Sequence, residues 1–556
     1  MTQFTTEPPT FNLWTEPWIT LERPDGTLDT PRGLEYTLLH AQDYRSLYEQ
    51  SPLVVAGIHR LLVAILHFAL KPNGKDYQDW NHNDLQLLWK TPEFPVAEIR
   101  QFGKTYAHSF DLFSTDKPFM QSSDIPTLLQ TLKKADRLKL ETTVAYLMPE
   151  IPTGSNVIHY RHGSESTDVF CPACAAKGLV IMSAFTAKGG AGKTPSINGT
   201  PPIYILPGGE TLYHSLRASL TTRPYQPGRT VEKDLVWWTR SPAIVEHAKA
   251  DKYDKSKSPK LIKRGLTDIG YLHGLTFTPR RVWLKPEYLN LPCTRCGQIS
   301  NWNVRKMVYQ AGESPSHINR EEFWRDPFVS YYPTSKESQS PPKAIIPKKD
   351  ISMWRNFVGL FLPLPVDGKQ QDWIANALRQ IAQITGDVYP FRCVGLVTKD
   401  ASAVEWLDAN LTVPLQLLLD LERGQDVRSG FTFAEDTAKN ILVKHFRRLL
   451  AASDKNKRYF TLRDQMLNDY WAALAYPFLS DFVPGMAKDE RKDAYRRWID
   501  TVVDEAKRAF RTYVLLAGHD GNALENQARA ISNCEISLLK KRKKHLSDRE
   551  KGESHE

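Results

Sequence analysis

The last third of the chain carries the clearest repeating pattern of apolar and polar positions. Apolar side chains recur every three or four residues from Tyr495 to Val514. This spacing places them on one face of an amphipathic α-helix about five turns long. From about Ala403 onward the sequence is typical of nearly continuous helix. We therefore expect residues 401–556 to form an all-α C-terminal four-helix bundle whose apolar stripes are its core. The basic tail Lys540–Lys544 is expected to be a solvated charged end, the alternative being contact with a phosphate backbone.

The first two thirds of the chain mix several patterns. Residues 11–19 are rich in aromatic side chains and predict a buried strand, whereas residues 34–70 predict helices. The apolar run Pro52–Leu70 is interrupted by His59, Arg60 and His67, and an arginine at the centre of a membrane costs about 2.5–3.5 kcal/mol. We interpret this run as a core helix that does not cross a membrane. Residues 1–400 are expected to form a large mixed α/β domain, so that the fold class is α+β with an all-α C-terminal bundle.

Composition and charge narrow the class of protein. The chain has 556 residues, more than one hydrophobic core supports, so two or three domains are expected. It is 41% hydrophobic and 24% charged, as in ordinary globular proteins, and its net charge is +10. That charge suggests a nucleic-acid partner but fits a merely basic protein equally well. The N-terminal residues MTQFTTEPPT do not resemble a secretory signal, so a cytoplasmic protein is expected.

Two pairs of cysteines indicate a metal site. Each pair has the spacing C-x2-C, at Cys171 and Cys174 and, far downstream, at Cys293 and Cys296. Four thiolates in such pairs are the ligand set of a structural zinc ion, which binds sulfur with tetrahedral geometry. The alternative is four unconnected thiols, some of them buried as small hydrophobic side chains. We expect one zinc ion to join the two pairs and to act as a structural cofactor.

A glycine-rich segment follows the first cysteine pair. Residues 187–194 read AKGGAGKT, which nearly matches the phosphate-binding P-loop G-x-x-x-x-G-K-[ST] and follows a strand-like apolar run at 179–185. A P-loop also needs a helix that begins at the lysine, so that its amides face the phosphate. The prolines and the glycine at positions 195–202 exclude a helix there. A P-loop NTPase is therefore only an alternative, and a cationic loop with exposed backbone that contacts another polyanion is favoured.

The sequence contains no recognisable catalytic arrangement. It lacks H-E-x-x-H, G-x-S-x-G and a pair of carboxylates in a clear helical or strand context. His59 and His67 flank the apolar helix and are interpreted as core or edge histidines with satisfied hydrogen bonds. We therefore expect a protein that is not an enzyme.

Taken in order, several of these features resemble one known family, the large subunit of the type I-E CRISPR surveillance complex Cascade (the CasA family). The resemblance spans nearly the whole chain, and the ordered set is more specific than any single motif. It is carried by Asn12–Ile19, Lys117–Gln121, Cys171–Cys174 with Gly189–Lys193 and Asn198–Pro201, Cys293–Gln298 with Ser300 and Asn301, and the helical C-terminal region.

The resemblance implies a subunit without enzymatic activity that inspects double-stranded DNA for the protospacer-adjacent motif. Base pairing by the guide RNA then reads the remaining sequence, so that the protein decides where unwinding of the duplex starts. In this family the motif is inspected from the minor groove, where the hydrogen-bond pattern is degenerate. The implied partners in antiviral defence are guide RNA, the other Cascade subunits, the DNA target and a recruited helicase-nuclease. The helical bundle is implied to face the small subunits.

The resemblance further implies three DNA-contacting devices: a glycine loop, a lysine finger and a wedge that opens the first base pair. Glycines lack a Cβ atom, so a glycine loop lets backbone groups approach the duplex. The family's wedge residue is often glutamine, whereas this chain has lysine followed by aspartate at that place. The glycine loop corresponds to Gly189, Gly190 and Ala191, with Lys193 close by. The lysine finger corresponds to Arg305 or Lys306, and the wedge corresponds to Thr398, Lys399 and Asp400.

A fourth segment, residues 156–162, matches the loop that docks near the 5′ end of the guide RNA in this family. Its side chains offer hydrogen-bond donors and an aromatic face for stacking on a base. Outside the family, the remaining alternative is a zinc-ribbon adaptor that binds nucleic acid without a guide complex. The RNA-proximal residues are Asn156, His159, Tyr160 and Arg161.

Overall fold

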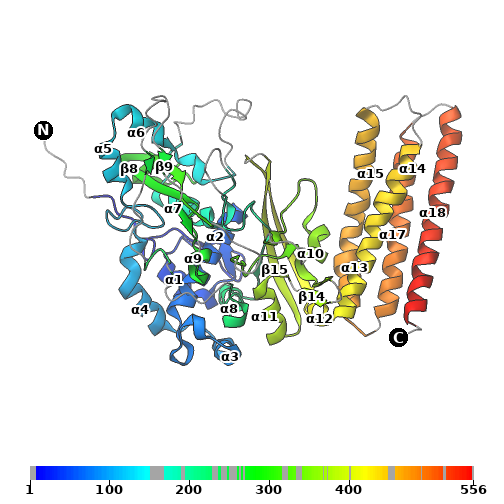
Figure 1. Cartoon of the computed structure of the whole chain (residues 1–556), viewed down its shortest axis with the longest axis horizontal. Helices are drawn as coiled ribbons and strands as arrows, with labels where there is room; N and C mark the ends of the chain where they lie inside the picture. Colours follow the sequence, from blue (N-terminus) through cyan, green and yellow to red (C-terminus); the bar gives the residue numbers. More distant parts are fainter. Residues whose placement is uncertain are drawn as a thin grey trace. The chain divides into compact units, whose positions relative to one another are not determined.

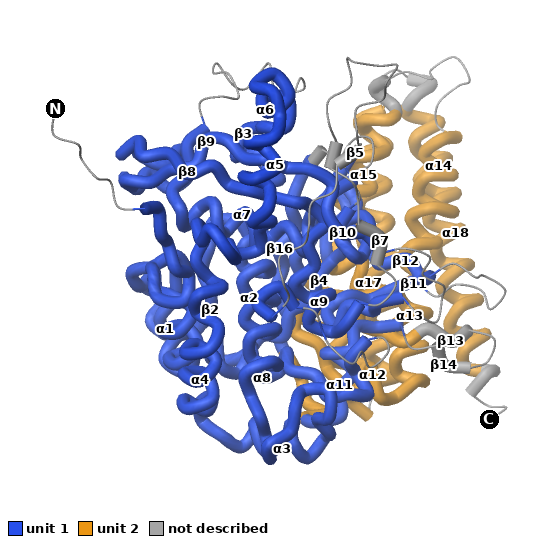
Figure 2. Tube along the Cα trace, turned by 60° about the vertical axis from the view of Figure 1, so that its left-hand side comes forward, with its two compact units in different colours: residues 1–353, 364–384, 390–410 blue, residues 354–363, 385–389, 411–556 orange. Residues whose placement is uncertain are grey.

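The chain folds into two compact units, each built from three stretches of sequence (Figure 2). Unit 1 comprises residues 1–353, 364–384 and 390–410, and unit 2 comprises residues 354–363, 385–389 and 411–556. The chain passes back and forth between the two units from residue 353 to residue 411. The expected domain boundary between residues 400 and 401 stays a prediction. The computed structural model describes residues 8–150, 168–188, 195–227, 234, 236–239, 247–248, 260–261, 264–266, 269–315, 323–332, 341–366, 369–371, 373–399, 402–448, 457–489, 491–517 and 521–553.

The apolar run in the first third forms helix α2 (Pro52–Ala69) of unit 1. Pro52 occupies the first helical position, where an amide hydrogen would have no partner within the helix. By length and composition α2 is apolar enough to cross a membrane, yet 94% of its residues are buried inside the structure. The prediction of a core helix is confirmed.

Helix α7 (Pro172–Phe185) packs against α2. The two backbones come close at Gly57, where an added Cβ atom would lie 3.1 Å from the Cα atom of Ile181. The strand-like run at 179–185 is the second half of α7, so the strand interpretation is wrong. A run that is apolar on every side does not distinguish a buried helix from a buried strand.

The aromatic-rich opening also differs from its prediction. Residues 11–19 form turns and isolated bridges instead of a strand, although Trp14 and Trp18 are buried as expected. The indole nitrogen of Trp18 donates to the carbonyl oxygen of Leu13 at 3.0 Å, which stabilises the turn. Burial of aromatic rings therefore follows from the sequence here, whereas the backbone conformation does not.

The longest strands in the described part of unit 1 belong to two three-stranded sheets. In the first, β8 (Arg280–Pro292) and β9 (Ile299–Ala311) form an antiparallel hairpin, and β3 (Glu141–Thr143) pairs with β9. The second has the order β16-β15-β4. Its members are β15 (Val388–Lys399), β16 (Ser402–Pro414) and β4 (Tyr204–Pro207), of which residues 388–389 of β15 and 411–414 of β16 are assigned to unit 2.

The remaining elements of unit 1 are shorter. Its other helices are α1 (Leu34–Leu39), α3 (His82–Lys90), α4 (Val96–Tyr106), α5 (Ile125–Thr131), α6 (Lys134–Leu140), α8 (Leu212–Ala218), α9 (Tyr271–Leu275) and α11 (Asn376–Ile384). Its other strands are β1 (Thr20–Glu22), β2 (Ser46–Tyr48), β5 (His247–Ala248), β6 (Lys260–Leu261), β7 (Arg264–Leu266), β10 (Glu313–Pro315), β11 (Tyr331–Tyr332), β12 (Lys343–Ala344), β13 (Leu364–Val366) and β14 (Lys369–Gln371).

Long helices lie side by side in unit 2 (Figure 1). Helix α17 (Arg491–Leu515) is the predicted amphipathic helix, and it buries Tyr495, Trp498 and Val502 among its neighbours α13, α15 and α18. Two of the helices contain a π-helical segment. The other elements are α10 (Phe357–Phe361), α12 (Gln416–Leu419), α13 (Leu421–Asp436), the π-helical η10 (Thr437–Leu442), α14 (Val443–Arg448), α15 (Lys457–Tyr476), the π-helical η11 (Pro477–Phe482), α16 (Val483–Met486) and α18 (Gly521–Glu553).

Ion pairs as well as apolar contacts hold α18 to its neighbours. The Arg549 guanidinium on α18 lies 2.6 Å from an Asp426 carboxylate oxygen on α13. Arg511 on α17 pairs with Glu535 on α18 at 2.5 Å. Both pairs join residues from different helices, so they add to the apolar contacts that hold α18 in the bundle.

The basic run Lys540–Lys544 lies within α18 and is not a separate tail. The Lys541 ammonium donates to the carbonyl oxygen of Phe433 at 3.1 Å, and the Arg542 guanidinium pairs with the Asp500 carboxylate. The other lysines of the run are exposed. Two of its cations therefore stabilise the helix packing, which corrects the expectation of a wholly solvated end.

Both histidines of α2 are buried and hydrogen-bonded, as predicted. The His59 Nε2 atom lies 2.7 Å from the Ser219 hydroxyl. The His67 Nδ1 atom lies 2.9 Å from the carbonyl oxygen of Val63, and the Thr221 amide donates to His67 Nε2 at 3.0 Å. Burial lowers the pKa of His59 to about 3 and the pKa of His67 to about 4, because a charged imidazolium would lose its hydration there.

We expect the free energy of unfolding to fall as the pH decreases from about 6.5 towards 4. The unfolded chain binds protons on these histidines at a pKa of about 6.5, while the folded chain keeps them neutral. Above about pH 6.5 the two histidines therefore do not lower the free energy of unfolding. Below that pH each histidine lowers it by up to about 1.4 kcal/mol per pH unit. Urea unfolding at a series of pH values measures this slope.

The variant His67→Gln, which does not titrate, should show a slope reduced by the share of one histidine. The matched control is His82→Gln, because His82 is exposed on α3. A slope in His67→Gln equal to that of the unsubstituted chain would show that His67 is not kept neutral by burial.

Candidate metal centre and nucleic-acid-contacting segments

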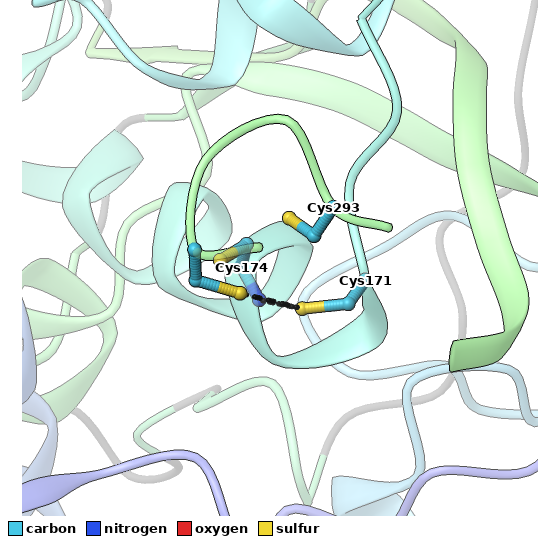
Figure 3. A group of neighbouring side chains, drawn as sticks. Cys171, Cys174 and Cys293 are labelled. Carbon is cyan, nitrogen blue, oxygen red and sulfur yellow. Dashed lines mark hydrogen bonds between the residues drawn. The ribbon is translucent and has the colours of Figure 1, made fainter. Parts of the chain in front are cut away.

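Four cysteines meet at one point of unit 1. Cys171 and Cys174 lie at the start of α7, and Cys293 and Cys296 lie in the turn between β8 and β9. Their sulfur atoms all lie within 4.8 Å of one another, and Figure 3 shows the side chains of Cys171, Cys174 and Cys293 converging. The predicted grouping of the two pairs is therefore confirmed.

The spacing of the sulfur atoms fits a tetrahedral metal ion. Bonds of about 2.3 Å from zinc to sulfur place neighbouring sulfur atoms about 3.8 Å apart. The Sγ atoms of Cys171 and Cys296 are 3.7 Å apart. The residues present thus match the ligand set and the size of a closed structural zinc site.

A helix cap presents the first pair. Cys171 is the N-cap residue of α7, and its sulfur accepts a hydrogen bond from the Cys174 amide at 3.5 Å. Pro172 follows at the first helical position, for which its fixed φ is suited. Both thiols are consequently held at one end of a buried helix.

A tight hairpin turn presents the second pair. The Cys293 amide donates to the carbonyl oxygen of Gln298 at 2.9 Å, and the Gly297 amide donates to the carbonyl oxygen of Cys293 at 2.8 Å. Gly297 has φ = +77°, a conformation that glycine adopts without steric cost. This turn keeps Cys293 and Cys296 together.

Backbone hydrogen bonds join the two pairs independently of the sulfur atoms. Phe170 and Val304 exchange two backbone hydrogen bonds, at 2.9 and 2.8 Å, and the Thr294 amide donates to the carbonyl oxygen of Val169 at 2.7 Å. These residues directly precede Cys171 or lie in the β8–β9 hairpin. The protein therefore arranges the four thiols by its own backbone contacts.

Close packing shifts the thiol pKa values in opposite directions. The pKa of Cys296 is lowered to about 6, chiefly because the Cys174 thiol hydrogen-bonds to its thiolate. The pKa of Cys174 is raised, first through its hydrogen bond with Cys171. Thiols this close share protons, since neighbouring thiolates repel one another. A divalent cation would remove that repulsion and bind all four as thiolates.

The two ends of the predicted glycine loop lie side by side. The Ser196 amide donates to the carbonyl oxygen of Thr186 at 2.9 Å, and the Arg280 guanidinium donates to the carbonyl oxygen of Ala187 at 2.9 Å. Thr186 directly follows α7, so this helix supports the base of the segment. The residues assigned to DNA contact, Gly189, Gly190, Ala191 and Lys193, lie outside the described residues, as do the RNA-proximal Asn156, His159, Tyr160 and Arg161.

The order of elements around this segment does not support a P-loop. A P-loop joins a strand to a following helix. Here helix α7 precedes the segment, and residues 195–203 contain turns and extended backbone without a helix. The prediction that no helix follows is confirmed for these residues.

The two candidates for the lysine finger are adjacent on β9 and differ in how tightly they are held. Arg305 Nε donates to a Glu287 carboxylate oxygen at 3.1 Å. Lys306 Nζ lies 3.9 Å from a carboxylate oxygen of Glu141. The same carboxylate also pairs with Lys285. Successive side chains of a strand point to opposite faces, so one face of the sheet presents only one of the two candidates. Lys306 is the more loosely held.

The candidate wedge lies at the end of a β-hairpin. Thr398 and Lys399 are the last residues of β15, and Lys399 is exposed. Further down the hairpin Arg392 pairs with Asp408 at 2.8 Å, which ties β15 to β16. Asp400 lies outside the described residues.

Known proteins resemble this chain in sequence. The family model described as CRISPR-associated protein Cse1 matches residues 12–509. The CRISPR-associated protein CasA/Cse1 of Thermus thermophilus is 29% identical over 242 residues. That alignment covers 42% of this chain and 42% of the curated relative, so less than half of the relative's length is matched.

Solved structures share the fold over nearly the whole chain. Cse1 of Thermobifida fusca superposes with a TM-score of 0.71 at 19% identity, covering 96% of this chain and 98% of that chain. A chain of a CRISPR RNA-guided surveillance complex superposes with a TM-score of 0.65 at 17% identity, covering 96% and 100%. The family model spans most of the sequence and confirms the resemblance found in the motifs. The chain belongs to the CRISPR-associated Cse1 family, the CasA family of type I-E Cascade large subunits.

Proposed function

We propose that this chain recognises the protospacer-adjacent motif in double-stranded DNA as the non-catalytic large subunit of a type I-E Cascade complex. Its role is to license where the guide RNA begins to pair, and thereby to help initiate the R-loop. Membership of the Cse1 family supports this function. The observation that carries it is the closed base of the segment 189–194, which is supported at the end of a buried helix.

The glycine segment is suited to contact a duplex for a physical reason. Gly189 and Gly190 have no Cβ atom, so backbone amides there can approach base edges in the narrow minor groove. The hydrogen bond between Ser196 and Thr186 holds the two ends of the segment together. A short loop on a fixed base loses less conformational freedom on binding than one whose ends move.

The other two devices complete the proposed interface. Lys306, paired only at 3.9 Å with Glu141, is the better candidate for a cation that reaches the DNA. Lys399, exposed at the end of the β15–β16 hairpin, is our candidate for the residue that intrudes between base pairs, at a cost of a few kcal/mol for one unstacked step.

The proposed partners follow from the same assignment. A neighbour in fold belongs to a CRISPR RNA-guided surveillance complex, which supports guide RNA and the other Cascade subunits as partners of this chain. Recruitment of a helicase-nuclease and a cytoplasmic role in antiviral defence complete the proposal. The exposed basic residues of unit 2 would add sequence-independent attraction to phosphates.

We also propose that Cys171, Cys174, Cys293 and Cys296 hold one structural zinc ion. The close approach of the four sulfur atoms supports this assignment. Zinc with four thiolate ligands has no open position, so the ion would cross-link α7 to the β8–β9 turn without taking part in chemistry.

The purified chain should contain one zinc ion per molecule, measured by elemental analysis. Cys293→Ser should lose the metal and lower the temperature of thermal unfolding, because it removes one of four ligands. Cys534→Ala is the matched control, since Cys534 is buried in unit 2 and should leave the metal content unchanged. Retention of a full zinc equivalent by Cys293→Ser would rule out this ligand set.

Gly190→Asp should abolish motif-dependent DNA binding by the assembled complex, because a charged side chain obstructs the approach to the duplex. The measurement compares the affinity of the complex for duplexes that carry an adjacent motif, drawn from a library of motifs, with its affinity for duplexes that lack one. We expect the ratio of the two affinities to fall at least about tenfold, or about 1.4 kcal/mol. Gly190→Val tests bulk without charge.

Asn83→Asp on the exposed surface of α3 is the control for added charge and should leave the ratio unchanged. Unaltered motif dependence in Gly190→Asp would remove the site assignment. Binding by the isolated chain that ignores the motif and needs no guide complex would instead favour a nucleic-acid adaptor outside CRISPR defence.

A further inference from the structure

Asn198, four residues beyond the glycine segment, uses its whole side-chain amide in hydrogen bonds. Its Nδ2 atom donates to Asp326 Oδ2 at 3.0 Å and to the Tyr204 hydroxyl at 3.3 Å. The Tyr331 hydroxyl donates to Asn198 Oδ1 at 3.1 Å. An asparagine with every partner supplied from other parts of the chain is held in one place.

The partner of Asn198, Asp326, belongs to a fully buried ion pair. Arg60 and Asp326 both have 0% side-chain exposure, and Arg60 Nη1 lies 2.8 Å from Asp326 Oδ2. The Phe328 amide donates to the other carboxylate oxygen of Asp326 at 3.0 Å. Among the described residues, no hydrogen-bond partner meets Arg60 Nε or Nη2. The positive charge of Arg60 is therefore balanced by the carboxylate of Asp326. Separating the two side chains would leave a buried charge without a partner, which is strongly destabilising.

The same cluster reaches the other end of the glycine segment. The Tyr204 hydroxyl, which accepts from Asn198, donates to the carbonyl oxygen of Ala184 in the last turn of α7 at 3.0 Å. The guanidinium of Arg60 lies over the Tyr204 ring, 4.8 Å from its centroid. Ala184, five residues before the segment, and Asn198, four residues after it, are thus tied to one buried polar cluster.

A turn transmits this anchoring to the base of the segment. The Gly199 amide donates to the carbonyl oxygen of Ser196 at 2.9 Å, and Gly199 has φ = +82°, which glycine tolerates. Ser196 in turn donates to Thr186. A displacement of Asn198 therefore moves Ser196 relative to the end of α7.

We propose that Asn198, held by the buried Arg60–Asp326 pair, is a positioning residue that fixes the two ends of residues 189–194 and so sets selectivity for the adjacent motif. This inference rests on the proposed function of that segment. Asn198 acts through the segment's base and has no contact with DNA in this proposal. It gives a role to the Asn198–Pro201 motif, which the family resemblance singles out without one.

The primary test is Asn198→Asp in the reconstituted guide-RNA complex. The substitution replaces a donor with a carboxylate that faces Asp326, and the two like charges repel. The ratio of affinities for DNA with and without the motif should fall about tenfold, as expected for residues coupled in one hydrogen-bond network. Affinity for DNA that lacks the motif should change less than about twofold, because phosphate contacts supply it. Asn83→Asp is the matched control.

Rescue distinguishes positioning from a loss of stability. Asn198→Asp combined with Asp326→Asn keeps one carboxylate and one amide facing each other beside Arg60, and should restore the ratio. Asn198→Ala removes the hydrogen bonds without adding charge and should give a smaller loss. A purely structural role would lower the unfolding temperature and weaken binding to both DNAs together.

Each outcome separates this inference from the proposed function. If Gly190→Asp abolishes motif dependence while Asn198→Asp and Asn198→Ala retain it, the inference is wrong and the proposed function stands. If the double variant folds with normal stability but the ratio is not restored, the inference is also wrong. If Gly190→Asp has no effect, the proposed function itself fails, whatever the Asn198 variants show.

Discussion

The close approach of four sulfur atoms joins two parts of unit 1 that lie far apart in the sequence. Cys171 caps α7 and Cys174 lies in its first turn, while Cys293 and Cys296 lie in the turn between β8 and β9, so the cluster joins this helix to a sheet. Helix α7 packs on α2 along one side and carries the base of the glycine segment at its far end. Fixing its start therefore determines where its end presents that segment.

A second constraint is the fully buried ion pair between Arg60 and Asp326, which involves none of the four cysteines. Arg60 lies in the mostly apolar helix α2, where a charge without a partner would be costly. Asp326 supplies the partner, and the two residues are 266 positions apart in the sequence. The pair links α2 to the strands around Tyr204 and Tyr331. One buried cation thus organises polar groups from several elements at the place where the chain leaves α7.

The sequence predicts those features that leave a local signal. The three-and-four spacing of Tyr495, Trp498 and Val502 identifies α17, and the paired C-x2-C spacing identifies the cysteine cluster. Helix α7 is missed because residues apolar on every side carry no period. The role of Arg60 is missed as well, because a sequence shows an interruption of the apolar run but not the distant carboxylate that accepts it.

The residues proposed to contact DNA show a different limit. Their assignment comes from resemblance, and the structure adds discrimination where it describes them. Adjacent positions 305 and 306 look interchangeable in sequence, yet alternation along β9 sends them to opposite faces and gives Arg305 the closer carboxylate. Pairings such as Arg305 with Glu287 depend on strand register, which a single sequence does not contain.

The ion pairs along α18 affect how ionic strength acts on this protein. Arg511 and Glu535 are partly exposed, with 57% and 25% of their side chains accessible, so dissolved salt weakens their attraction more than it would weaken that of a buried pair. The same ions compete for DNA phosphates and oppose counterion release. For the proposed DNA binding, a salt titration therefore combines weakening of these ion pairs with weakening of phosphate contacts, and its slope counts phosphates alone only when helix packing is followed in parallel.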